Sequence, residues 1–281
     1  MAIPYAEVIG DPIAHSKSPL IHKFWLEKLG VEGEVRRCLV SPATLPAYLA
    51  TRRADSAWLG CSVTAPLKKR AVQLLGGPSN ACRWLQAANL IVNDAGRLAT
   101  FNTDVRGIEE ALSGLNFPEA AVCILGAGGA AQAALCCSIQ NSARHVSVVA
   151  RDIRKAKMLL DLVDVPTSTR MEAEDFAGAL IAICGANLII NATPMGMPGH
   201  GPMHREVLGA LPLEVSDRVV VFDMVYTPLE TEFLAVARRE EGKIIDGLAM
   251  LIGQAAPAFE HLFGLPPPRQ FDSKLRALLI Q

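Results

Sequence analysis

The sequence predicts an α/β protein with two domains, one of which is built on a doubly wound parallel sheet. Short runs of β-type residues alternate with helical patterns along most of the chain, and this alternation is typical of parallel sheets covered by helices. The chain has 281 residues, of which 51% are hydrophobic. Because domains usually span about 100–200 residues, this length favours two domains with apolar cores.

The first block of elements predicts a mostly parallel sheet. We expect its strands at 6–10, 36–40, 58–64, 89–93 and 98–101. The last two flank Asp94-Ala95-Gly96-Arg97, whose residues are common in hairpin turns. We expect its helices at 20–29, at about 45–53 and from about 68.

The second block predicts a doubly wound unit. We expect short buried strands at 122–125, 145–150, 188–191, 219–223 and 243–245, with helices between them, for instance at 154–162 and 230–241. Tail helices at 248–263 and 273–280 do not continue the alternation, so we expect them to pack on the first block. The chain therefore divides into an N-terminal α/β domain over 1–105, completed by helices in 247–281, and a doubly wound domain over 106–246.

The composition excludes several classes of protein. The formal net charge is −1, aromatic residues make up 5%, and the longest basic run is Lys68-Lys69-Arg70, so we expect neither nucleic acid nor a membrane as a partner. The start lacks the pattern of a signal peptide, and no stretch of about 18 apolar residues occurs. The seven cysteines form no CxxC pair and the six histidines do not cluster, so we expect no metal site. We expect a soluble protein of the cytoplasm.

A glycine-rich turn links a buried strand to a helix. Gly126-Ala127-Gly128-Gly129-Ala130 follows the strand at 122–125 and opens an alanine-rich helix. Such glycines permit a tight turn and a close backbone approach, and the helix N-terminus presents N–H groups to a pyrophosphate. The alternative is a turn that serves only helix–sheet packing. The strand–turn–helix context favours a dinucleotide-binding (Rossmann) domain.

The residues after the next strand bear on the choice of dinucleotide. Arg151 and Arg154 suit the 2′-phosphate of NADP, whereas an acidic side chain such as Asp152 accepts hydrogen bonds from the free ribose diol of NAD. The alternative is that Asp152 only caps the helix that begins near Ile153. The two arginines favour NADP, with NAD left possible.

Polar side chains follow several strands of the first block, where the carboxyl ends of parallel strands form ligand sites. Hydroxyl, amide, ammonium and carboxylate groups there suit a small polyhydroxylated acid; the residues are Ser16, Ser18, Thr64, Lys68, Asn102, Thr103 and Asp104. Each has a simpler alternative. Ser18 before Pro19 is a possible helix N-cap, Lys68 a possible exposed lysine and Asp104 a possible cap of a helix at 105–112, while we expect His22 on a helix surface.

Eight motifs, in order, resemble the shikimate dehydrogenase family with its quinate-oxidising relatives. They are GDPIAHSKSPLIH, SVTAPLKKRA, AAN at 87–89, FNTD at 101–104, ILGAGGAA, NATPMGM, FDMVYTPLET and DGLAMLIGQAAPAFE, and the likeness runs from about residue 5 to about residue 264. The resemblance implies an N-terminal substrate domain completed by C-terminal helices, and a Rossmann domain that binds NADP or NAD.

The resemblance also implies roles for individual residues. Lys68 and Asp104 fall on the catalytic pair. The substrate side then comprises Ser16 and Ser18 for the carboxylate, with Thr64, Asn89, Asp104, Gln254 and Tyr226 for the rest of the molecule. The cofactor side comprises the turn Gly126, Ala127, Gly128, Gly129 and Ala130, the adenosine-phosphate segment Arg151, Asp152 and Arg154, and Met224 and Gly247 near the nicotinamide.

Four short segments depart from the family's usual motifs. Ser62-Val63-Thr64 replaces N-V-T, Ala87-Ala88-Asn89-Leu90 replaces A-x-N-T, Thr100 replaces the glycine of G-x-N-T-D, and Ala150-Arg151-Asp152 stands where N-R-T is common. The polar groups assigned to chemistry are all present. The departures therefore leave the reaction type in place and bear on substrate and cofactor preference.

The resemblance implies a reversible hydride transfer between NADPH and 3-dehydroshikimate that gives shikimate, with Lys68 moving the proton and Asp104 orienting it. One alternative is a relative that prefers quinate, NAD or another cyclic polyol acid. Another is a non-catalytic homologue that only binds ligand. We expect a small-molecule substrate and a monomer or homodimer. The resemblance implies a place in the shikimate pathway of aromatic amino acid biosynthesis, and the sequence leaves both a biosynthetic and a degradative role open.

Overall fold

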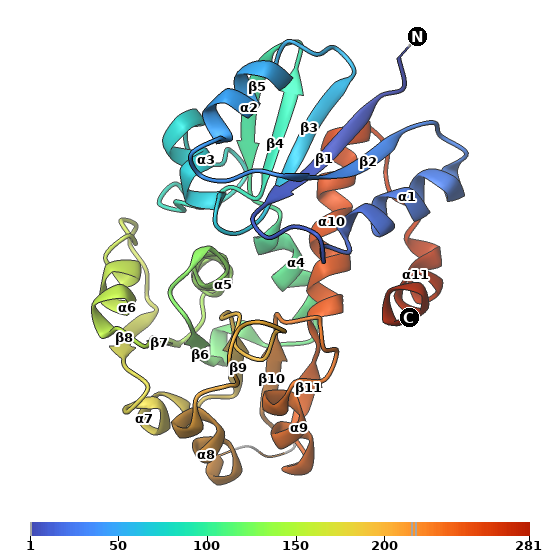
Figure 1. Cartoon of the computed structure of the whole chain (residues 1–281). Helices are drawn as coiled ribbons and strands as arrows, with labels where there is room; N and C mark the ends of the chain where they lie inside the picture. The colour runs from blue at the N-terminus through green and yellow to red at the C-terminus, as the bar shows by residue number, and fades with distance from the viewer. Residues whose placement is uncertain (1, 215, 217) are drawn as a thin grey trace. The chain divides into compact units, whose positions relative to one another are not determined.

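The computed structural model describes residues 2–214, 216 and 218–281 of the chain (Figure 1). The chain divides into two α/β units. The first unit comprises Met1–Gly107 together with Leu251–Gln281, and the second comprises Ile108–Met250. The divisions fall inside helix α4 (Asp104–Ala111) and helix α10 (Gly247–Phe263).

The sheet of the first unit has the strand order β2-β1-β3-β4-β5. Strands β1 (Tyr5–Gly10), β2 (Glu34–Leu39) and β3 (Trp58–Val63) are parallel, and the hairpin of β4 (Leu90–Asp94) and β5 (Arg97–Phe101) is added to β3. Because β4 is antiparallel to both of its neighbours, β5 runs in the direction of β1 and β3. The carboxyl ends of β1, β3 and β5 and the amino end of β4 therefore share one edge of the sheet.

The helices of the first unit are α1 (Ser18–Leu29), α2 (Leu45–Arg52), α3 (Lys68–Leu75), the greater part of α10 and α11 (Asp272–Ile280). Helix α11 packs on α1. Helix α10 packs Ala258 and Leu262 against Ala6 and Leu90 of the sheet. The C-terminal helices thus return to the N-terminal unit, as the sequence predicts.

The sheet of the second unit is entirely parallel, with the order β11-β10-β9-β6-β7-β8. The strands are β6 (Ala121–Leu125), β7 (His145–Val149), β8 (Arg170–Glu174), β9 (Leu188–Asn191), β10 (Val220–Asp223) and β11 (Lys243–Ile245). Counted within the unit, this is the order 3-2-1-4-5-6 of a dinucleotide-binding domain. The winding reverses between β6 and β9, so the loops after these two strands border the place where such domains bind their ligand.

The helices of the second unit enclose an apolar core on both faces of the sheet. They are α5 (Gly129–Gln140), α6 (Ile153–Leu160), α7 (Ala179–Ile183), α8 (Arg205–Glu214) and α9 (Glu232–Arg239), with a 3₁₀ turn at Phe117–Glu119. One cluster joins Ile189 and Val221 of the sheet to Val207 of α8 and to Phe233 and Leu234 of α9. This burial fixes the strands whose ends carry the polar residues described below.

The sequence analysis missed one strand, and its expectation for His22 was wrong. Strand β8 has no counterpart among the predicted strands, because an edge strand with three charged residues in five (Arg170, Glu172 and Glu174) lacks the apolar run of a buried strand. His22, expected on a helix surface, is buried on α1, with its ring stacked 5.8 Å from that of Phe259 and edge-on to Trp25 at 6.0 Å. Burial lowers the pKa of His22 to about 4.

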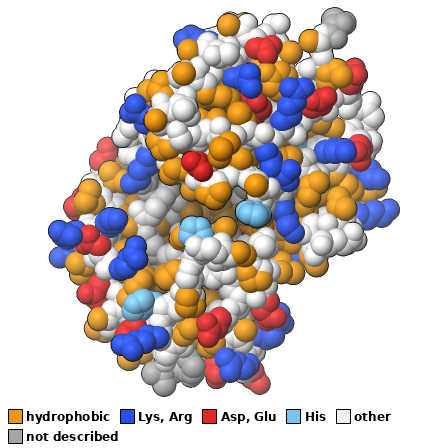
Figure 2. Space-filling view, in the orientation of Figure 1, with side chains coloured by type: hydrophobic (Ala, Val, Ile, Leu, Met, Phe, Trp, Pro, Cys, Tyr) orange, Lys and Arg blue, Asp and Glu red, His pale blue; other side chains and the backbone are white. Residues whose placement is uncertain are grey.

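The visible surface carries charges of both signs. In Figure 2, Lys and Arg side chains are interspersed with Asp and Glu, so no patch of one sign dominates this face. Among the described residues, every helix is too short or too polar to cross a membrane.

Candidate active site

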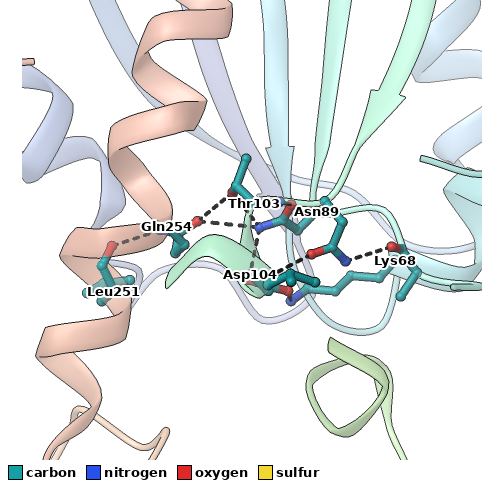
Figure 3. A network of polar contacts seen from close by, with 9 residues as sticks. Lys68, Asn89, Thr103, Asp104, Leu251 and Gln254 are labelled. Atoms are coloured by element: carbon teal, nitrogen blue, oxygen red, sulfur yellow. Dashed lines mark hydrogen bonds and ion pairs between the residues drawn. The ribbon is translucent and has the colours of Figure 1, made fainter. Parts of the chain in front are cut away.

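An ion pair stands at the shared edge of the first sheet. Lys68 is the first residue of α3, shortly after β3, and Asp104 is the first residue of α4, shortly after β5. The Lys68 Nζ lies 2.5 Å from Asp104 Oδ2 (Figure 3). The lysine side chain is 19% exposed and the aspartate side chain 6%, so an incoming molecule reaches the ammonium more readily than the carboxylate.

Asn89 holds the other carboxylate oxygen. Its Nδ2 donates to Asp104 Oδ1 and to Thr103 Oγ1, both at 2.9 Å, and its Oδ1 accepts the Thr103 backbone N–H at 2.6 Å. These bonds fix which side of the amide faces Asp104, because only the NH₂ group donates. Asn89, Thr103 and Asp104 are all buried, so their positions are set by the protein and not by solvent.

Helix α10 adds a residue from the far end of the chain. Gln254 Oε1 lies 3.4 Å from both Asn89 Nδ2 and Thr103 Oγ1, and its Nε2 donates to the Leu251 carbonyl at 2.9 Å (Figure 3). We call Lys68, Asn89, Thr103, Asp104 and Gln254 the lysine–aspartate network.

Strand directions explain why these residues meet. The Asn89 backbone donates to the Phe101 carbonyl at 3.1 Å and accepts from Val63 N–H at 2.7 Å, so β4 begins where β3 and β5 end. The Ala88 N–H also donates to the Lys68 carbonyl at 3.1 Å. The hairpin thereby brings Asn89, which precedes β4, to the same edge of the sheet as Lys68, which follows β3, and Asp104, which follows β5.

The simpler interpretations of these residues do not hold. The N-cap of α1 is Lys17 and not Ser18, which is buried as the first helical residue. Lys68 is mostly enclosed, and Asp104 uses its carboxylate on Lys68 and Asn89. The cap of α4 comes from Asn102, whose Oδ1 accepts from Val105 N–H at 3.3 Å.

Ser16, Ser18 and Thr64 lie at the ends of neighbouring strands. Thr64 N–H donates to the Ile9 carbonyl at 2.9 Å, and a Cβ placed on Gly10 would lie 2.4 Å from Thr64 Cγ2. The segment that carries Ser16 and leads to Ser18 at the start of α1 therefore begins against Thr64. In the part of the chain that the structure describes, the serine hydroxyls make no hydrogen bond with the lysine–aspartate network; Ser16 Oγ accepts from Ser18 N–H at 3.4 Å.

Thr103 and Asn102 are supporting residues to which sequence reasoning gave no individual role. Asn102 donates to the Ala87 carbonyl at 2.8 Å and exchanges two hydrogen bonds with Asn80, at 2.8 and 3.1 Å. Both residues stand in the FNTD motif next to Asp104. A polar run that remains wholly buried is the signal that identifies them as positioning residues.

The glycine turn of the second unit fits an anion. Helix α5 begins at Gly129 after Gly128, which provides no side-chain cap, so the N–H groups of the first turn face outward. A Cβ on Gly128 would meet nothing within 4 Å, whereas a Cβ on Gly126 would lie 3.0 Å from Thr193 Cγ2, at a φ of +112°. Gly126 is therefore required by the fold, and Gly128 leaves open space beside the helix end. Ala127 and Ala130 lie in and just after this turn.

Two arginines follow β7: Arg154 forms an ion pair with Asp152, and Arg151 is exposed. Asp152 caps α6, accepting from Arg154 N–H at 3.1 Å, and pairs with the Arg154 guanidinium at 2.9 and 3.0 Å. The guanidinium keeps the pKa of the Asp152 carboxyl below its usual range. The expectation that Asp152 caps this helix is confirmed. Arg151 is exposed directly after the strand end.

Met224, Tyr226 and Gly247 also belong to the second unit. Met224 N–H donates to the Asn191 carbonyl at 3.0 Å, and Tyr226 follows as a half-buried residue. A Cβ on Gly247 would lie 2.5 Å from the Val225 carbonyl oxygen and 2.6 Å from that of Met224. Gly247 is thus needed for close packing of the start of α10 on the segment after β10. Within residues 2–214, 216 and 218–281, no three His, Cys, Asp or Glu side chains lie close enough together to hold a metal ion.

The sequence matches a known family and its members. A model of the shikimate dehydrogenase substrate binding domain matches residues 8–91. Shikimate dehydrogenase (NADP(+)) of Sphingopyxis alaskensis is 42% identical over 280 residues, which cover 99% of this chain and 98% of the relative. The similarity extends over both units.

Solved structures are similar over the same length. Shikimate 5-dehydrogenase of Thermus thermophilus, in complex with NADP(H) and shikimate, is 31% identical with a TM-score of 0.82, over 99% of this chain and all of that one. Quinate dehydrogenase of Corynebacterium glutamicum, in complex with NAD, is 29% identical with a TM-score of 0.84, over 98% of this chain and 99% of that one.

Proposed function

Because the chain belongs to the shikimate dehydrogenase family, we propose that it is an NADP-dependent oxidoreductase that interconverts shikimate and 3-dehydroshikimate. The observation that carries this proposal is the hydrogen-bonded pair of Lys68 and Asp104 at the end of the first sheet, 2.5 Å apart. A reaction at a CH–OH group needs one proton donor and acceptor beside the carbon, and this pair supplies it.

Lys68 moves the proton, and Asp104 positions the ammonium group of Lys68. In the reducing direction the ammonium donates to the ketone oxygen of the substrate, and in the oxidising direction the neutral amine accepts from the hydroxyl. Asp104 holds the ammonium through Oδ2 while Asn89 holds Oδ1, so the carboxylate cannot rotate away. Because the Lys68 side chain is more exposed than that of Asp104, we expect a substrate oxygen to meet the lysine and not the carboxylate.

The remaining polar groups of the first unit hold the substrate. Ser16 and Ser18 provide hydroxyls for its carboxylate, and Thr64, Asn89 and Gln254 provide partners for its ring hydroxyls. In the free chain the Asn89 amide donates to Asp104 and Thr103. A ring hydroxyl bound there donates to Asp104 and takes the place of one of these protein contacts. The resemblance to the family assigns Tyr226 to the substrate as well.

The second unit holds NADP. Bound NADPH supplies the hydride, and NADP⁺ receives it in the reverse direction. The N–H groups at the start of α5 bind the pyrophosphate beside Gly126, Ala127, Gly128, Gly129 and Ala130. Arg151 binds the 2′-phosphate, because the charge of Arg154 is already paired with Asp152. Met224 and Gly247 flank the nicotinamide. In this assignment residues 1–105 with 247–281 form the substrate domain, and 106–246 the cofactor domain.

Steady-state kinetics with shikimate and quinate, each with NADP and NAD, test the proposal. We expect the highest kcat/KM with shikimate and NADP. The similarity to a quinate dehydrogenase in complex with NAD makes the second candidate a quinate-oxidising enzyme, for which quinate and NAD would give the highest value. Binding of shikimate without turnover in all four combinations would contradict both and indicate a non-catalytic homologue. We further assign the enzyme to the cytoplasm, as a monomer or homodimer that size-exclusion chromatography distinguishes.

A further inference from the structure

The ends of β9 and β10 carry a buried polar chain with no role in the assignments above. Asn191, the last residue of β9, and Asp223, the last residue of β10, are fully buried, and Thr231 at the start of α9 is 3% exposed. Asn191 Nδ2 donates to Asp223 Oδ1 at 2.8 Å, and Thr231 Oγ1 donates to Asp223 Oδ2 at 2.5 Å. Three elements are thereby tied together through one carboxylate.

The hydrogen-bond network of Asn191, Asp223 and Thr231 extends to Thr193 after β9. Thr193 donates to Asn191 Oδ1 through its backbone N–H at 3.0 Å and through its hydroxyl at 2.6 Å. The same hydroxyl accepts from Met195 N–H at 3.2 Å. Because both Thr193 donors meet Asn191 Oδ1, the amide can present only its NH₂ group to Asp223. The orientation of every member is therefore determined by its neighbours.

Thr193 is also the residue that meets the glycine turn. A Cβ on Gly126 would lie 3.0 Å from Thr193 Cγ2 and 3.1 Å from the Ala192 carbonyl oxygen, so the two loops are already in close contact. The Ala192 N–H donates to the Leu125 carbonyl at 2.9 Å, just before the turn. The position of Thr193 therefore determines how the segment after β9 packs against Gly126.

We propose that Asn191, Asp223 and Thr231 are positioning residues for the cofactor, because they hold Thr193 against Gly126 and so set the shape of the turn that binds the pyrophosphate. This inference rests on the proposed function. A carboxylate with three neutral donors and no exposure has no contact with solvent through which to move protons, whereas a satisfied buried network fixes geometry. The end of the network at Asn191 and Thr193, after β9, borders the place between β6 and β9 where the winding of the sheet reverses and such domains bind dinucleotides.

The test compares the two ends of β9. Asn191→Ala removes the network at the carboxyl end. Asn187→Ala is the matched control, since Asn187 Oδ1 accepts from Ala121 N–H at 2.9 Å at the amino end, away from the turn. Both variants lose a hydrogen-bonded asparagine, and thermal unfolding measures the stability that each loses. The dissociation constant for NADP is measured by fluorescence titration of the whole chain.

We expect Asn191→Ala to raise the NADP dissociation constant about tenfold or more, with the KM for shikimate changed less than about threefold. We expect Asn187→Ala to leave the NADP dissociation constant within about twofold of that of the unaltered protein. Thr231→Val weakens NADP binding, and Thr231→Ser, which keeps the hydroxyl, restores it. Equal NADP constants for the Asn187 and Asn191 variants, or equal constants for the two Thr231 variants, would overturn the inference.

A second measurement tests the path through the turn. If Asn191 acts through Gly126, the effects of Asn191→Ala and Gly126→Ala on the NADP constant are less than additive. Additive effects would overturn the inference while leaving the proposed function intact. Failure of the unaltered chain to bind NADP would contradict the proposed function itself.

Discussion

The two units each place an aspartate at the carboxyl end of a strand, and the surroundings of the two carboxylates differ. Asp104 pairs with the partly exposed ammonium of Lys68, whereas Asp223 is fully buried among neutral donors from Asn191, Val225 and Thr231. Burial raises the pKa of the Asp223 carboxyl, and its hydrogen bonds oppose that rise. The difference distinguishes a catalytic network from a structural one. The substrate must reach Lys68, the proton-exchanging partner of Asp104, whereas Asp223, which holds loops in place, is best kept away from solvent.

Among these predictions, removal of the Lys68 ammonium has the largest expected effect on kcat. Lys68→Ala lowers kcat by about 10²–10⁴-fold, with shikimate binding within several-fold, because the acid–base group is lost and the substrate contacts remain. Lys69→Ala, at the exposed neighbouring position, serves as the control and leaves kcat unchanged. A Lys68→Ala enzyme with more than a tenth of the normal kcat would remove the distinction between the two networks.

Loss of the serine hydroxyls affects binding and not turnover. Ser16→Ala and Ser18→Ala raise the KM for shikimate by roughly tenfold or more, since a hydrogen bond to a charged group is worth about 1.5–3 kcal/mol. The contact to a non-reacting carboxylate is made in the ground and transition states alike, so kcat stays near normal. A normal KM with a reduced kcat would place the substrate carboxylate elsewhere.

Arg151 and Asp152, which follow β7, sharpen the comparison within the second unit. Arg151→Ala raises the KM for NADP by more than about tenfold and leaves that for NAD unchanged, because only NADP carries the 2′-phosphate. Asp152→Ala changes neither KM much and lowers the melting temperature, because the side-chain cap of α6 is lost. Selective weakening of NAD by Asp152→Ala would instead indicate that the carboxylate holds the ribose diol.

Gly126 and Gly128 of the turn differ in role: Gly126 is needed for the fold, and Gly128 leaves space for the cofactor. Gly126→Ala lowers both the melting temperature and NADP affinity, because its φ of +112° and the 3.0 Å approach of Thr193 Cγ2 leave no room for a Cβ. Gly128→Ala weakens NADP binding severalfold with an unchanged melting temperature, since its Cβ meets only the space that the phosphates need. Calorimetric unfolding and NADP titration of both variants give this contrast; equal melting temperatures would contradict it.

His22 offers a third case, a buried polar group with an unsatisfied atom. Among the described residues, none offers its Nδ1 a hydrogen bond, and its pKa is about 4 in the fold, against about 6.5 in an unfolded chain. The unfolded state therefore binds the extra proton, and stability that is complete above about pH 6.5 falls as the pH drops toward 4. This linkage costs about 2 kcal/mol between pH 7 and pH 5.

Replacement of His22 by an aromatic residue that does not titrate isolates this effect. His22→Phe keeps the stacking on Phe259 and loses the acid-dependent part of the stability. Urea unfolding at pH 7 and pH 5 measures the difference for both proteins. An equally steep loss in the variant would assign the pH dependence to other groups; activity at neutral pH is the same in either case.

Local signals made much of the fold predictable. Strands of the second sheet such as β6 and β9 are buried apolar runs, and the hairpin turn has Ala95 and Gly96 at positive φ, 48° and 89°, as its residues indicate. Strand β8 and the burial of His22 were not predictable, because an edge strand needs no apolar run and a helix face is buried only by what packs on it. The site residues were assigned because they match motifs of the family. The contacts between them could not be predicted from their spacing in the sequence.

The sequence by itself determined the alternation of strands and helices, the glycine turn before α5 and the chemical types of the polar residues at the strand ends, because each depends on neighbours a few positions away. Only the tertiary structure decided which of these residues meet. Asn89 and Gln254 are separated by 165 positions, and Asp223 lies 32 positions from Asn191. Such contacts depend on strand order and direction: the antiparallel β4 brings Asn89 to the end where β3 and β5 finish, and the parallel pairing of β9 and β10 aligns their last residues.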